Sequence, residues 1–276
     1  MNWTAVRAIA EKDLRTVLRN RGVRVPLIVA PVVLLIVLPL LLVLGGQALT
    51  ANSPLPMDSM GDTIIGRSLT SQEAATSSVT TPGTGQWAAF VLEVFFAPLY
   101  LLVPLVVATV IAADSFAGER ERGTLEALLH TPTTDQELLT AKFLAAWTPA
   151  VVVGTVGFVV YCAVANLAGW PTIGRIFFPN LTWVLLGFWV SPAVAALGLG
   201  VMVIVSSRVE SLQAAHQIGS LLVLPIILLV VAQVSGAIRL GPELVAGAGL
   251  VIWLVAALMV RYGATSLRRE HLALRL

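Results

Sequence analysis

Six long apolar runs, separated by polar segments, dominate the chain. A helix of about 20 apolar residues is long enough to cross the hydrocarbon core of a bilayer. The pattern therefore predicts an all-α, polytopic membrane protein with six transmembrane helices in one membrane domain. The predicted spans are 25–46, 87–113, 143–167, 182–205, 218–235 and 243–260.

The longest polar segment is 47–86, between the first and second spans. It is rich in Ser and Thr, contains no lysine and has a single arginine, Arg67. Within it, Thr70 and Glu73 have the spacing of a capping box, which favours a short helix. A polar loop of this length is usually either functional or disordered, and the sequence alone favours neither.

Residues 2–20 are predicted to form an amphipathic helix that lies on the membrane. Apolar side chains recur there at steps of three and four, and charged side chains fall on the opposite arc. A basic amphipathic helix before a span is typical of an interfacial position facing anionic lipid. An ordinary solvated helix is the alternative. The apolar residues are Trp3, Val6, Ala10, Leu14 and Val17, and the charged ones are Arg7, Glu11, Lys12, Arg15 and Arg19.

The segment 114–142, between the second and third spans, is the longest charged segment between two apolar runs. Four alternating charges at 119–122 continue the second span. Gly123 then breaks the helix, Thr124 can cap a new short one, and Pro132 ends it. A second capping box, Thr134 with Glu137, begins the helix that leads into the third span. From spacing alone, a solvated loop explains these charges equally well.

The short helix predicted after Gly123 carries one leucine face. Its leucines lie at spacings of three and four, so they share one side of the helix. A short helix held beneath the membrane between two spans is suited to contact a soluble partner. The leucines are Leu125, Leu128 and Leu129.

Composition supports the membrane prediction and excludes some functions. The chain is 57% hydrophobic and 12% charged, whereas soluble domains carry about 25% charged residues. A net charge of +2 is too small to indicate nucleic-acid binding. Cys162 is the only cysteine, which excludes an intrachain disulfide and a cysteine metal cluster. The first apolar run begins at Val25 and is too long for a signal peptide, so we expect a retained span.

The distribution of positive charge predicts the orientation. Lys and Arg number six before the first span, three between the second and third, one between the fourth and fifth, and four after the sixth. These 14 Lys and Arg residues belong to segments on one predicted side of the membrane. The segments on the other side carry only Arg67, Arg175 and Arg239. Positive charge accumulates on the cytoplasmic side of membranes, so both termini are predicted to be cytoplasmic.

Glu93 is the charged residue that lies well inside an apolar run. Charges in spans usually face the bundle interior or a water-filled cavity, which favours a gate, a pathway or an inter-subunit role. Trp87 marks the nearby outer interface, so a purely structural glutamate at that interface is equally compatible. Gln233, Gly154 and Gly157 are expected to serve helix packing.

Most other chemistry is not indicated. The chain contains no G-x-x-x-x-G-K-[ST] motif, so we do not expect it to hydrolyse ATP. An intramembrane serine protease would need a histidine in a span, and His130, His216 and His271 all lie outside the spans. No metal-ligand pattern occurs, and no cofactor is expected in this chain.

Two stretches carry a resemblance to a known family. GERERGTLEALLHTP at 118–132, followed by ELLTAKFLAA at 137–146, resembles the signature region of type-2 ATP-binding-cassette (ABC) permeases, the membrane subunits of a class of ABC exporters. AIAEKDLRTVLRNRG at 8–22 is similar to the N-terminal cytoplasmic helix of that family. Six spans and a large loop after the first agree with it.

The resemblance implies a permease subunit, in a homodimer or heterodimer, with ATPase subunits docked below. ATP and Mg²⁺ would bind in those partners, and the chain would be a multi-pass protein of the cell membrane. Residues 124–130 would be the coupling helix and 2–20 the connecting helix. A secondary transporter or channel without an ATPase is the alternative, although Glu93 is the one span-embedded charge to support it. The implied coupling residues are Glu119, Arg120, Glu121, Arg122, Gly123, Thr124, Leu125, Glu126, Leu128 and Leu129.

Overall fold

The computed structural model describes residues 3–52, 88–121, 134–209 and 211–266. Every regular element in these ranges is helical, which confirms the all-α prediction. Six helical stretches are long and apolar enough to cross a membrane, as predicted. They are Gly22–Gly46, Phe90–Gly118, Glu137–Pro171, Leu181–Ser206, Leu212–Val234 and Pro242–Gly263.

The chain begins with α1 (Trp3–Arg19), which packs against the third span. On its predicted apolar stripe Val6 is buried, but Trp3 is 63% exposed. Asn20 separates α1 from the first span, and its side chain accepts a hydrogen bond from Gly22 N–H at 3.0 Å. The first span is then built from α2 (Arg21–Val32), η1 (Val33–Val37) and α3 (Leu38–Asn52).

The second and fourth spans form the centre of the bundle. Their most apolar windows are 72% and 61% buried, against 17% for the first, fifth and sixth spans. The second span joins η2 (Phe90–Phe95), α7 (Phe96–Tyr100), α8 (Leu102–Ala113), η3 (Asp114–Gly118) and α9 (Glu119–Glu121). The fourth joins α12 (Leu181–Leu185), η4 (Leu186–Val190) and α13 (Ser191–Ser206).

The third span belongs to one long helix, α11 (Asp135–Ile173). Its start is the predicted capping box: Thr134 Oγ1 accepts from Glu137 N–H at 3.3 Å, and the Glu137 carboxylate accepts from Thr134 N–H at 3.1 Å. The helix ends at Gly174, whose φ of 68° is left-handed and favours glycine. It therefore extends beyond the predicted span 143–167 on both sides.

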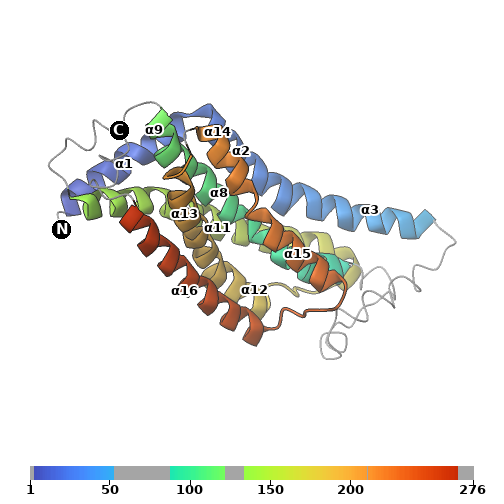
Figure 1. The fold of residues 1–276 in the computed structure, drawn as a ribbon. Coiled ribbons are helices and arrows are strands. Elements are labelled where there is room, and N and C mark those ends of the chain that lie inside the picture. Colours follow the sequence, from blue (N-terminus) through green and yellow to red (C-terminus); the bar gives the residue numbers. More distant parts are fainter. Residues whose placement is uncertain (1–2, 53–87, 122–133, 210, 267–276) are drawn as a thin grey trace.

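The fifth span is interrupted: α14 (Leu212–Ser220) and α15 (Val223–Val234) are separated by two residues. The sixth is α16 (Pro242–Ser266), which packs closely on α13. Figure 1 shows α1, α9, α14 and the last turns of α16 at one end of the bundle. The ends of α3 and α15 lie at the other, as expected for a chain that crosses six times.

Candidate functional site

A buried ion pair joins the second and third spans at the end of the bundle where segment 122–133 leaves it. Lys142 Nζ lies 2.5 Å from Glu119 Oε2 and donates to the Ser115 carbonyl oxygen at 2.9 Å. Lys142 is 1% exposed and Glu119 is 9% exposed. Nζ also lies 5.4 Å from the centre of the Phe116 ring, within the range of a cation–π contact. The lysine is thus surrounded by groups that stabilise its charge.

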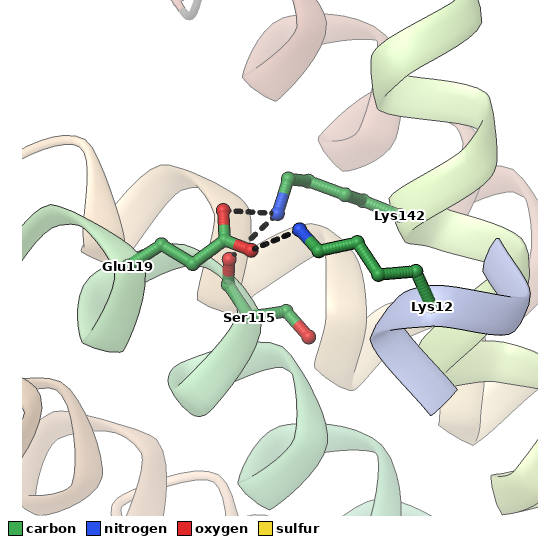
Figure 2. A network of polar contacts seen from close by, with 4 residues as sticks. All are labelled: Lys12, Ser115, Glu119 and Lys142. Carbon is green, nitrogen blue, oxygen red and sulfur yellow. Dashed lines mark hydrogen bonds and ion pairs between the residues drawn. The ribbon is translucent and has the colours of Figure 1, made fainter. Parts of the chain in front are cut away.

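The N-terminal helix reaches the same carboxylate from another direction. Lys12 of α1 places Nζ 4.0 Å from Glu119 Oε1, and Figure 2 shows the two lysines approaching one glutamate from two helices. Nearby, Asn20 Nδ2 lies 3.4 Å from Asp114 Oδ1. The Lys12 side chain is 57% exposed, so its ion pair is screened by water and contributes little stability. Its effect is to position α1 against η3 and α9.

We name the residues Lys12, Ser115, Glu119 and Lys142 the stem. Burying a charge is costly unless it is paired and hydrogen-bonded, and removing one partner of such a pair leaves the other uncompensated. The stem residues therefore hold three helices in one arrangement. Glu119 precedes segment 122–133 and Lys142 follows it. The ion pair therefore joins the helix that leads into the segment to the helix that comes after it.

The second glutamate of the charged tetrad contacts a different helix. Glu121 Oε2 accepts a hydrogen bond from Leu212 N–H, the first residue of α14, at 2.8 Å. A carboxylate at the N-terminus of a helix pairs with its free N–H groups and with the positive end of its dipole. Glu119 and Glu121 therefore connect the end of the second span to the third and fifth spans respectively.

The protein is thus a helical bundle with an N-terminal helix docked on the base of its second and third spans. The model of the ABC-2 family transporter proteins matches residues 7–269, nearly the whole chain. The chain belongs to this family. It is accordingly a membrane permease of the ABC exporter class and a multi-pass protein of the plasma membrane. No protein with a curated description matches it.

Few of the coupling residues predicted for this ABC-2 permease fall in the part that the structure describes. Glu119 and Glu121 make the contacts given above, and Arg120 belongs to α9 between them. The others lie outside the described residues: Arg122, Gly123, Thr124, Leu125, Glu126, Leu128 and Leu129.

Glu93 lies in η2, a π-helical turn whose backbone is anchored by two aromatic side chains. Tyr161 Oη donates to the Leu92 carbonyl at 2.7 Å, and Trp183 Nε1 donates to the Glu93 carbonyl at 3.0 Å. The Tyr161 and Trp183 rings stack with centroids 4.8 Å apart. Short π-helical turns often occur at functional sites. The two hydrogen bonds hold the backbone of this turn and so fix the position of the Glu93 Cα atom.

Glu93 lines a cavity of about 70 Å³. Because the second span begins beside Glu93 and ends at the stem, the cavity lies at the end of the bundle opposite the stem. Gln233 and Arg239 also line it, with Asn180 and Thr182 from the start of the fourth span. Gln233 is 5% exposed, and its Oε1 accepts no hydrogen bond within the described part of the chain. A cavity of this size can hold several water molecules.

Sequence reasoning did not single out Lys12, Ser115 or Lys142 as site residues. A usable signal exists, because consecutive spans joined by a short segment lie side by side and antiparallel. Glu119 and Lys142 have opposite charges and flank the same segment, so they can meet at one depth. In the described ranges no group of three or more His, Cys, Asp or Glu residues could hold a metal ion.

Proposed function

We propose that this ABC-2 permease is driven by a separate ABC ATPase that docks against segment 122–133 and binds ATP and Mg²⁺. The observation that carries the proposal is the buried Glu119–Lys142 pair at the base of that segment. This pair bonds the end of the second span to the start of the third, so the two spans are expected to move together. Displacement by the ATPase would then pass to the second and third spans together, as rigid-body coupling.

The leucine spacing supports a docking role for the segment. Leu125, Leu128 and Leu129 share a face if residues 124–130 are helical. Such a face would form an apolar patch in water unless a partner covers it. A groove on the ATPase is the partner surface that suits it, in the helix-in-groove mode of recognition. Basic α1, which packs on α11 beside the stem, is the proposed connecting helix.

Two further elements complete the proposal. The first, fifth and sixth spans bury little of their apolar surface within one chain, which supports pairing with a second permease subunit as well as contact with lipid. The charge bias supports cytoplasmic termini, with the stem cytoplasmic and the Glu93 cavity near the external surface. Glu93 would then border the substrate pathway at its outer end.

Co-purification tests the docking step. The permease is expressed with each ABC ATPase subunit of its source organism in turn, and the ATPase recovered with the tagged permease is measured. Leu128→Asp is expected to lower recovery at least tenfold, because it places a charge in the apolar face. Gln217→Asp is the control, since it adds the same charge to an exposed position on α14 at the same end.

Failure of the docking surface and failure of the proposed function give different results. Full recovery of the ATPase with Leu128→Asp would show that the leucine face is not the docking surface. Failure of the unmodified permease to recover any ATPase would contradict the proposed function itself.

A further inference from the structure

The charged residues 119–122 are divided between two tasks. Glu119 is bonded across the stem to Lys142, so it holds the base of segment 122–133. Glu121 is the last described residue before that segment, and its carboxylate is bonded to Leu212 N–H of the fifth span, 91 positions further along the chain. Motion of the segment therefore meets Glu121 before it meets any other described residue of the second span.

The N-terminus of α14 is held by two acceptors of different origin. Ser211 is the local cap, and its Oγ accepts from Ala214 N–H at 3.2 Å. Glu121 supplies the other acceptor, from a different span, and its hydrogen bond is charge-assisted. The two contacts cap the same helix, but only the Glu121 contact connects it to segment 122–133.

The helix of the fifth span is broken between α14 and α15. The first of these, α14, has nine residues and is separated from α15 by Leu221 and Leu222, which form a turn. Pro225 follows within the first turn of α15 and lacks an N–H donor. On its inner side α14 packs on α13, α8 and η3. A force applied at its N-terminus would tilt α14 about this turn.

We propose that Glu121 is a positioning residue that transmits displacement of segment 122–133 to α14, and so to the fifth span. This inference rests on the proposed function, because the displacement is supplied by the docked ATPase. It adds a direct route from the end of the second span to the fifth: the stem holds the base of the segment, while the carboxylate of Glu121 pulls on the first N–H of α14.

Hydrogen exchange of α14 tests this route directly. The complex of permease and ATPase is held in nanodiscs, without nucleotide or trapped with Mg·ATP and orthovanadate. Mass spectrometry follows amide exchange in peptides that cover 211–222. In the unmodified complex, trapping is expected to change exchange in α14 at least threefold. Glu121→Ala is expected to abolish this difference while the ATPase remains bound, and Glu121→Gln, which keeps an acceptor, to retain part of it.

Ser211→Ala is the matched control, because it removes a cap from the same helix without touching the link. It is expected to raise exchange in both states and to preserve the nucleotide-dependent difference. Equal loss of the difference in Ser211→Ala and Glu121→Ala would reduce Glu121 to a helix cap, and a full difference in Glu121→Ala would remove it from the route. Absence of any difference in an unmodified complex that hydrolyses ATP would also overturn the inference, whereas absence of a complex would count against the proposed function.

Discussion

Lys142 is a lysine buried in a protein that is otherwise poor in charge. Its ammonium group donates to the Glu119 carboxylate and to the Ser115 carbonyl oxygen. Lysine and glutamate are seldom fully buried unless they are paired. The pair is weak evidence of stability for its own sake, because well-packed apolar residues often serve as well. Here it joins the second span to the third, and Lys12 brings α1 to the same carboxylate.

Substitutions in the stem are expected to change the stability of the folded permease in a specific pattern. Lys142→Met leaves Glu119 buried without its nearest cation and should lower the stability of the folded permease by about 3 kcal/mol. The double variant Lys142→Met with Glu119→Gln should regain part of the loss, because neither side chain then carries an uncompensated charge. Thermal unfolding of the purified protein in detergent measures both. An unchanged melting temperature in Lys142→Met would contradict the stem as described.

Much of the fold at the scale of elements follows from periodicity. The six spans and the capping box at Thr134 were predictable because apolar length and cap spacing are local signals. The start of α11 followed from its capping box, but its continuation to Ile173 did not, because Gly169 and Pro171 usually interrupt or end a helix. Asp114 and Glu119 were expected in a polar region outside the bundle, yet both are buried among helices. Their burial depends on α1 and α11, which are distant in sequence.

Side chains that hold a loop by hydrogen bonds to its backbone are also hard to predict from sequence patterns. Asn166 lies in an apolar run, and its side chain accepts from Phe177 and Phe178 N–H at 3.2 and 3.3 Å. Its amide nitrogen donates to the Phe178 and Cys162 carbonyls at 2.8 Å each. One asparagine therefore positions the connection between the third and fourth spans. Nothing in its spacing distinguishes it from an asparagine that only packs between helices.

The close packing of α13 on α16 gives a prediction at the same scale. A Cβ at Gly200 would lie 2.8 Å from Met259 Cβ and 3.2 Å from the Val260 backbone nitrogen, so the helices would have to separate. Gly200→Ala should therefore lower the melting temperature. Gly247→Ala in α16 is the control, because nothing lies within 4 Å of its Cβ and alanine favours helix by about 1 kcal/mol. Equal melting temperatures for the two variants would contradict the packing described.

At the scale of the whole molecule, polar groups concentrate at opposite ends of the bundle. The stem and the Glu121 contact lie where the second span ends, and the cavity bordered by Glu93, Gln233 and Arg239 lies where it begins. The second and fourth spans, which form the buried centre, run between these ends. A permease driven by a separate ATPase requires that a displacement at the stem change the structure at the opposite end of the bundle. We therefore expect the two ends to be mechanically linked through the central spans.

The most direct test asks whether nucleotide binding at one end changes the other. Glu93→Cys, in a Cys162→Ser background, is placed in the complex with the ATPase in nanodiscs. The rate of labelling by a water-soluble thiol reagent is measured without nucleotide and after trapping with Mg·ATP and orthovanadate. Thr182→Cys, which lines the same cavity, is a second reporter, and buried Leu92→Cys is the unreactive control.

Trapping is expected to change the labelling rate at Glu93→Cys and Thr182→Cys at least threefold. Gly123→Pro, which resets the backbone where segment 122–133 begins, should remove this change while the ATPase stays bound. Equal labelling rates in the two states, in a complex that binds and hydrolyses ATP, would contradict the claim that the ATPase drives this permease through its stem.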